Sequence, residues 1–178
     1  MKMKTQRWLI ASATGMLVLG IAPTASAAPG DTTATVTITG GALEISVPAT
    51  AGNLGTRANT VNGGTISGLL GQVQVTDARS AAAGSGWVAS VISTAFTPPS
   101  GPTIGAANVS YTAGTITKTG TATYTANNPG NLTGASPAVT ATGITGDNSA
   151  TWNPTIHVAV AGGTVANTYS AVITHSVL

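Results

Sequence analysis

The chain has 178 residues, of which 42% are hydrophobic and only 6% are Asp, Glu, Lys or Arg. It contains no cysteine, which excludes disulfides and thiolate metal sites within the chain. Plentiful, regularly spaced β-branched residues exclude disorder for most of its length, because disordered chains are usually poor in such residues and highly charged.

The first residues have the three parts of a secretory signal peptide. Residues 1–7 carry three basic side chains, residues 8–22 are apolar or small, and Ala25-Ser26-Ala27 has the small-residue pattern of a cleavage site. We therefore predict a signal peptide at 1–27 and a single secreted domain at 28–178, with cleavage one residue later equally compatible. The alternative is an N-terminal membrane anchor, for which the apolar run is short.

Removal of the signal changes the charge of the protein. The remaining charged side chains are Arg57, Arg79, Lys118, Asp31, Glu44, Asp77 and Asp147. Three basic against four acidic residues give a net charge of −1, without a basic patch. The mature form is therefore expected to bind no nucleic acid. Because no further long apolar run follows the signal, it is also expected to have no membrane span.

The first segment after the signal alternates in hydrophobicity like a β-strand. Apolar residues alternate with Thr through residues 32–39, Gly40-Gly41 follows, and residues 43–47 alternate again until Pro48. Gly-Gly is a tight-turn dipeptide, so the pattern predicts a hairpin.

The next part of the chain contains the segment expected to lie at the centre of the fold. Residues 49–64 and 78–86 are rich in Gly and small residues and read as loops, whereas 65–70 and 72–76 read as strands. Residues 87–96 place apolar side chains on both parities, which predicts a central strand with both faces buried.

The C-terminal half continues as short strands. We expect strands at 108–111, 115–118, 121–125, 137–142, 151–160 and 168–177, with a turn at 143–148. Pro154 implies an edge position or a bulge within its strand. Since no segment of the mature chain has a helical period, the predicted fold is all-β, an antiparallel Ig-like β-sandwich of about nine or ten short strands.

Three segments resemble a known family. They are residues 40–48, residues 73–79 leading into Gly86-Trp87-Val88-Ala89, and residues 169–177. Together they are similar to the WxL domain of Gram-positive bacteria, in a divergent form of the kind seen in actinobacteria. The family has Leu where this chain has Ala89, Trp at the position of His175, and Leu at the positions of Ile173 and Val177.

The resemblance implies a non-catalytic protein that is secreted and extracellular. Its expected partner is the bacterial cell wall, with peptidoglycan as the ligand bound non-covalently, and other surface proteins are further candidate partners. The alternative from the residues themselves is a structural or assembly subunit, pilin-like or surface-layer-like, that polymerises through exposed strand edges.

Four residues are candidates for ligand binding, and each has a competing role in the core. Trp87, Trp152 and Tyr169 could stack on a ligand, and His175 occupies the position of the family's second Trp. All four have the parity of buried side chains, so packing is the favoured interpretation. We expect no catalytic residues, metal or cofactor, because the acids are scattered and the two histidines lack ligand spacing.

Overall fold

A computed structural model describes residues 32–178, and within it Ile38–Leu178 forms one compact unit. The predicted signal peptide lies outside the described residues. The strands are β1 (Leu43–Ser46), β2 (Gly64–Leu69), β3 (Val73–Ser93), β4 (Val109–Thr112), β5 (Ile116–Ala126), β6 (Ser136–Trp152), β7 (Thr155–Val160) and β8 (Ile173–Val177). A short 3-10 helix, η1 (Ala106–Asn108), precedes β4. The all-β sandwich is confirmed, with strands that are fewer and longer than expected.

The strands form two antiparallel sheets. One has the order β1-β3-β6-β5, with β8 also paired to β3, and the other has the order β2-β7-β4. β6 takes one edge of β3, and β1 and β8 share the other edge. The predicted central strand is therefore central, although it ends at Ser93 and only one parity (Trp87, Ala89, Val91) is fully buried within it. On the other parity Val88 and Ile92 are half-buried, and Phe96 is buried but lies beyond the end of β3.

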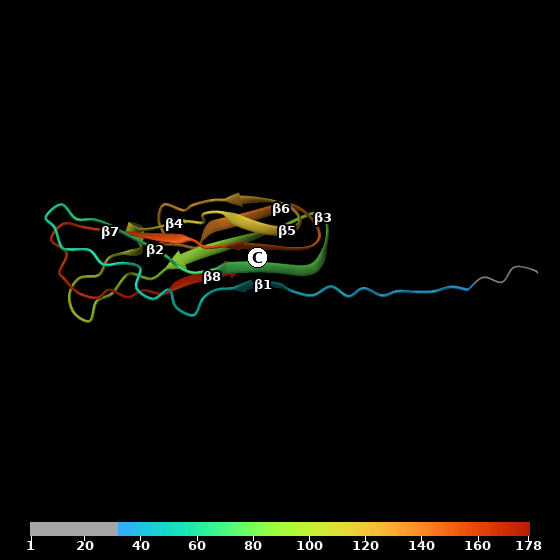
Figure 1. The fold of residues 1–178 in the computed structure, drawn as a ribbon, viewed down its shortest axis with the longest axis horizontal. Helices are drawn as coiled ribbons and strands as arrows, with labels where there is room; N and C mark the ends of the chain where they lie inside the picture. Colours follow the sequence, from blue (N-terminus) through green and yellow to red (C-terminus); the bar gives the residue numbers. More distant parts are fainter. Residues whose placement is uncertain (1–31) are drawn as a thin grey trace, which may run out of the picture. The chain divides into compact units, whose positions relative to one another are not determined.

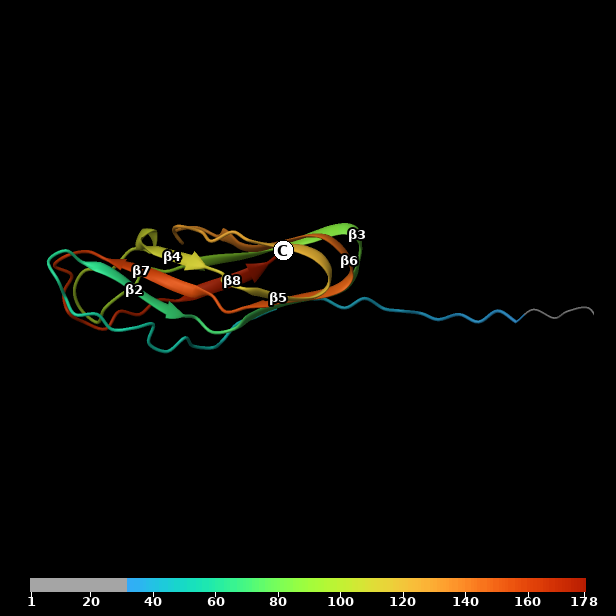
Figure 2. The ribbon, with the colours of Figure 1, turned by 45° about the horizontal axis from the view of Figure 1, so that its top comes forward.

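Three neighbouring strands bend at one end of the sandwich (Figure 1 and Figure 2). The predicted loop at 78–86 and the predicted turn at 143–148 are both wrong, because these residues lie inside β3 and β6. The ladder continues through the bend, with Ala81 opposite Gly146 and with register shifts on both sides of that pair. β5 is bulged at the same level, around Gly120. Small and glycine residues thus curve the strands without ending them.

The bend folds the five-stranded sheet over itself. Asn148 lies opposite Asp77 before the bend of β3, whereas Trp87 lies after it and pairs with Ala141. Nevertheless, the Trp87 indole N–H donates to the Asn148 side-chain oxygen at 3.0 Å. The two halves of β3 and β6 therefore face each other across the core.

The predicted strand at 151–160 is divided between the two sheets. β6 ends at Trp152 and β7 begins at Thr155, so the chain changes sheets at Asn153-Pro154. Pro154 is buried, and its carbonyl accepts the Leu70 N–H at 2.9 Å. The predicted alternation continues across the change of sheets, because Trp152, Pro154 and Ile156 are all buried.

The predicted N-terminal hairpin is wrong. Within the described residues, 32–39 form no strand, and β1 pairs instead with the start of β3, in register with Leu43 opposite Asp77. The contact extends to Gly41, whose N–H donates to the Ala78 carbonyl. It ends where Ser80 takes a positive φ of 53°, because the backbone of β3 turns away there.

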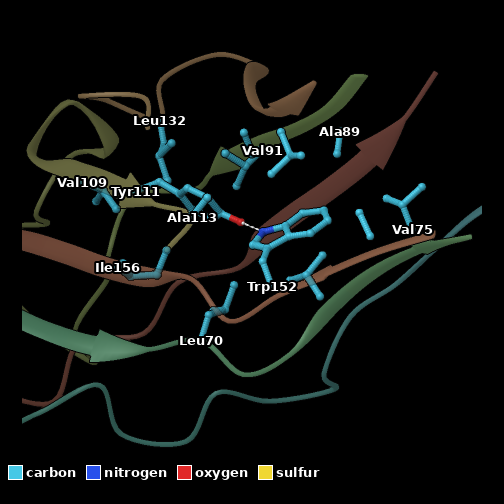
Figure 3. Packing of buried hydrophobic residues seen from close by; sticks show 14 of the residues in the cluster. Leu70, Val75, Ala89, Val91, Val109, Tyr111, Ala113, Leu132, Trp152 and Ile156 are labelled. Carbon is cyan, nitrogen blue, oxygen red and sulfur yellow. Dashed lines mark hydrogen bonds between the residues drawn. The ribbon is translucent and has the colours of Figure 1, made fainter. Parts of the chain in front are cut away.

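The core lies between the facing layers. Figure 3 shows Trp152 in the middle of a cluster that includes Leu70, Val75 and Ile156. Over residues 32–178, the structure contains no helix with the length and apolar character needed to cross a membrane.

Candidate functional site

Trp87 belongs to a buried polar network at the bend and is not available to a ligand. Its side chain is 2% exposed and its ring lies 5.7 Å from that of Tyr124, centre to centre. The Asn148 oxygen that accepts its N–H also accepts the Tyr124 hydroxyl at 3.2 Å. One amide thus satisfies two aromatic donors, as buried polar groups require.

The same network contains an ion pair in which the carboxylate is buried and the guanidinium is partly exposed. Asp77 is fully buried, and Arg79 donates to its two oxygens at 2.8 and 2.9 Å. The Asn148 amide nitrogen donates to Asp77 at 3.3 Å. The Arg79 hydrogen bonds hold the pKa of the Asp77 carboxyl below its usual value, against the effect of burial. Residues 75–79, which belong to the second of the three segments that resemble the WxL domain, therefore have a structural role at the bend.

Trp152 and His175 converge on one hydroxyl group. The Trp152 indole N–H donates to the Tyr111 oxygen at 2.6 Å, shown as the dashed line in Figure 3, and His175 Nε2 lies 3.2 Å from the same oxygen. Trp152 is 2% exposed. Burial lowers the pKa of His175 to about 4, so the ring is neutral at pH 7. His175 is half-buried, and its hydrogen-bond partner is the Tyr111 side chain.

Tyr169 lies apart from the other three candidates. It is half-buried beside the core, and its hydroxyl donates to the Val165 carbonyl at 2.8 Å. Of the four predicted residues, it alone lines the large cavity at the end of the sandwich opposite the bend.

This cavity, which we call the end cavity, has a volume of about 870 Å³. Its walls are the loop at 48–60 and the loop at 161–172, which lie together at the end away from the bend in Figure 1. Apolar side chains of the sheets form its floor, among them Ile66, Leu70 and Phe96. Amide and hydroxyl side chains surround it: Asn53, Asn59, Asn167, Thr50, Thr56, Thr60, Thr164 and Thr168.

Arg57 is the one charged residue among the described residues that line the end cavity. Its guanidinium donates to the Gly63 carbonyl at 2.5 Å, which fixes the side chain against its own loop. The two loops meet where the Gly163 N–H donates to the Thr60 carbonyl at 3.4 Å. Next to this contact, an added Cβ at Gly162 would lie 1.8 Å from the Val61 carbonyl oxygen. Only glycine permits this approach.

Sequence reasoning missed this site. It identified residues 49–64 as a loop but gave them no function, because polar loop composition is common and the two walls are about a hundred residues apart in sequence. The available signal was a lone Arg in a segment composed mostly of Gly, Ala, Asn and Thr.

His157 joins three strands of the smaller sheet. Its Nδ1 lies 2.8 Å from the Ser67 hydroxyl and its Nε2 lies 3.2 Å from the Thr112 hydroxyl, from β2 and β4 respectively. Both ring nitrogens are therefore occupied by hydroxyls, and within residues 32–178 no carboxylate orients the ring. A Ser-His-acid triad needs that third group, so the cluster fits a cross-strand contact.

The part of the chain that the structure describes contains no group of three or more His, Cys, Asp or Glu side chains close enough to hold a metal ion. Comparison with family models, with curated proteins and with solved structures finds no match to this chain. The similarity to the WxL domain therefore stays a prediction, and the end cavity is the site on which a function can be argued.

Proposed function

We propose that this chain is a secreted, non-catalytic protein that associates non-covalently with the bacterial cell wall through the end cavity. The single observation that carries the proposal is the composition of that cavity: an apolar floor, a rim of amides and hydroxyls, and Arg57 as the lone charge. Concave sites with apolar walls and a few polar groups are the usual form of ligand sites.

This composition is complementary to peptidoglycan. Asn and Thr side chains offer both donors and acceptors to sugar hydroxyls and acetamido groups, and an apolar floor can pack against the C–H faces of sugar rings. Carboxylates of the glycan and of its stem peptides are matched by a guanidinium, which binds a carboxylate through two parallel hydrogen bonds. The exposed apolar side chains of Val165 and Val172 at the rim add contact area.

The proposal also explains how residues 32–178 could bind a wall although both of their tryptophans are buried. Trp87 and Trp152 are both 2% exposed, and the indole N–H of each donates to another side chain of the protein. Tyr169 is the predicted ligand-binding residue that reaches the proposed site.

The test is co-sedimentation of the chain from Ala28 onward with purified Gram-positive cell walls, over a series of protein concentrations. We expect wall-dependent pelleting, and we expect Arg57→Ala to weaken it by about tenfold, the equivalent of about 1.4 kcal/mol for a charge-assisted hydrogen bond. Glu44→Gln, which removes an exposed charge from β1 outside the end cavity, is the control and should bind as the wild type does.

Two outcomes would contradict the proposal. If the wild-type chain does not pellet with walls, it is not a wall-binding protein. If it pellets and Arg57→Ala pellets equally well, binding occurs elsewhere and the end cavity is not the site.

A further inference from the structure

We propose that residues 32–39 of one copy of this chain add as a strand to the free edge of β5 in the next copy, at residues 122–126. The inference goes beyond wall binding, and it names the donor segment (32–39) and the acceptor edge (122–126) of a polymer.

The donor segment has a strand pattern and no strand partner within the described residues. Ala34, Val36 and Ile38 alternate with Thr along its length, and it contains no charge and no proline. Nevertheless it forms no strand, and Val36 and Ile38 are 89% and 84% exposed. An uncharged alternating segment of this kind is typical of residues that pair with an open edge.

The acceptor edge has the complementary properties. β5 pairs with β6 on one side, and in the described chain no backbone hydrogen bond reaches its other side. The first half of β5 carries the features that usually block an edge, Lys118 and the bulge around Gly120. Residues 122–126, Ala-Thr-Tyr-Thr-Ala, have no charge, no proline and the same alternation with Thr as the donor segment.

The match extends to both faces of the added strand. Ala122, Tyr124 and Ala126 are half-buried and pack against the core, while Thr123 and Thr125 are exposed. A donor strand with Val36 and Ile38 on the core side would cover these half-buried side chains. Its threonines would then lie beside Thr123 and Thr125, and cross-strand Thr pairs are favourable.

The proposed acceptor belongs to another copy of the chain. The donor segment leads into β1, and β1 and β5 lie at opposite edges of the order β1-β3-β6-β5. A neighbouring copy can accept the whole segment, and a head-to-tail contact of this kind generates an open chain of subunits.

The test is sedimentation velocity without any wall material, over a wide range of protein concentrations, using substitutions at exposed threonines that leave the core intact. The wild-type chain from Ala28 should form larger species as concentration rises. A variant with Thr35→Lys, Thr37→Lys, Thr123→Lys and Thr125→Lys should remain a monomer, because like charges then face each other across the new pair. A second variant, with Thr35→Glu and Thr37→Glu in the donor segment and Thr123→Lys and Thr125→Lys in the acceptor edge, should assemble again because opposite charges then face each other.

The matched control carries four lysines at exposed positions elsewhere: Ala83→Lys, Ser100→Lys, Thr103→Lys and Ala135→Lys. It should assemble as the wild type does. A wild-type chain that stays monomeric at all concentrations overturns the proposal, and so does a four-lysine pairing variant that still assembles. Because no wall is present, these results are independent of whether the end cavity binds peptidoglycan.

Discussion

Asn148 joins the two halves of the folded sheet through a single amide. Its oxygen accepts from Trp87 and Tyr124, and its nitrogen donates to buried Asp77. Asn148→Leu keeps the approximate size but leaves these groups with fewer partners in a dry site. We expect it to lower the free energy of unfolding by about 2–4 kcal/mol, because unsatisfied buried polar groups are costly.

The measurement for Asn148→Leu is urea-induced unfolding at pH 7. Asn127→Leu is the control, since this exposed amide makes one side-chain hydrogen bond, to Thr140. Its effect should stay within about 0.5 kcal/mol. Equal effects of the two substitutions would mean that the buried network does not hold the bend together.

His175 makes the stability of the fold dependent on pH in a defined range. The Tyr111 oxygen accepts the Trp152 N–H, so its own proton is directed to His175 Nε2, and Nδ1 has no partner among the described residues. The ring has a pKa of about 4 when folded and 6.5 when unfolded, so between these values the unfolded chain binds more protons. Stability is therefore complete above pH 6.5 and falls by about 3 kcal/mol as the pH is lowered to 4.

Unfolding free energies of the wild type and of His175→Phe, measured between pH 7 and pH 4, test this effect. The variant has no group titrating at that position, so its stability should change much less over the same interval. Asp77 does not confuse the comparison, because its pKa is lowered from 3.8 and its contribution is lost only at still lower pH. Identical pH slopes for the two proteins would contradict the assignment.

At the scale of the element, the bend in β3 depends on Ser80. This residue has a φ of 53°, and its N–H donates to Asp147 at 2.9 Å, a bond that any residue except proline can make. Its hydroxyl makes only a longer hydrogen bond to the same oxygen, at 3.4 Å. Ser80→Gly should raise the free energy of unfolding by up to about 1 kcal/mol, because glycine adopts positive φ without steric cost. Ser80→Val should lower it by about 1–2 kcal/mol, because a β-branched side chain is the least tolerant of this conformation. Thermal unfolding of the three proteins measures both shifts, and a Val variant as stable as the wild type would show that the bend is not fixed at Ser80.

The strands could be predicted where period two is local, as at residues 73–76 and at 173–177. The bend could not, because a run of small residues looks the same in a loop as in a curved strand. What keeps 78–86 in the sheet is its pairing with residues more than sixty positions later in the chain, such as Ala81 with Gly146. The predicted hairpin at 32–47 was wrong because β1 does not pair with the segment next to it in the sequence. It pairs instead with the start of β3, about thirty residues later.

The same limit applies to the candidate site. Burial of Trp87, Trp152 and His175 was the favoured interpretation of their parity, and the structure places all three in or against the core. The end cavity could not be predicted, because it exists only where two loops distant in sequence lie over the floor formed by Ile66 and Phe96.

At the scale of the whole molecule, the end cavity and the acceptor edge are separate surfaces, and their effects should combine. An assembled chain presents several cavities to a repeating polymer, so the second and later contacts are intramolecular. Substitution of Thr35, Thr37, Thr123 and Thr125 by Lys should therefore weaken apparent wall affinity by on the order of 10²-fold. Co-sedimentation over a series of protein concentrations measures the apparent wall affinity. The variant with Glu at 35 and 37 and Lys at 123 and 125 should recover the affinity of the wild type.

The control with four lysines elsewhere has the same added charge as the pairing variant but keeps the donor segment and the acceptor edge. It should bind walls at least as well as the wild type, which separates the effect of charge from the loss of assembly. Arg57→Ala should behave in the opposite way: assembly is retained, and every subunit in the polymer binds weakly. A monomeric variant that binds walls with full wild-type affinity would show that single cavities suffice, and that assembly through the donor segment contributes nothing to attachment.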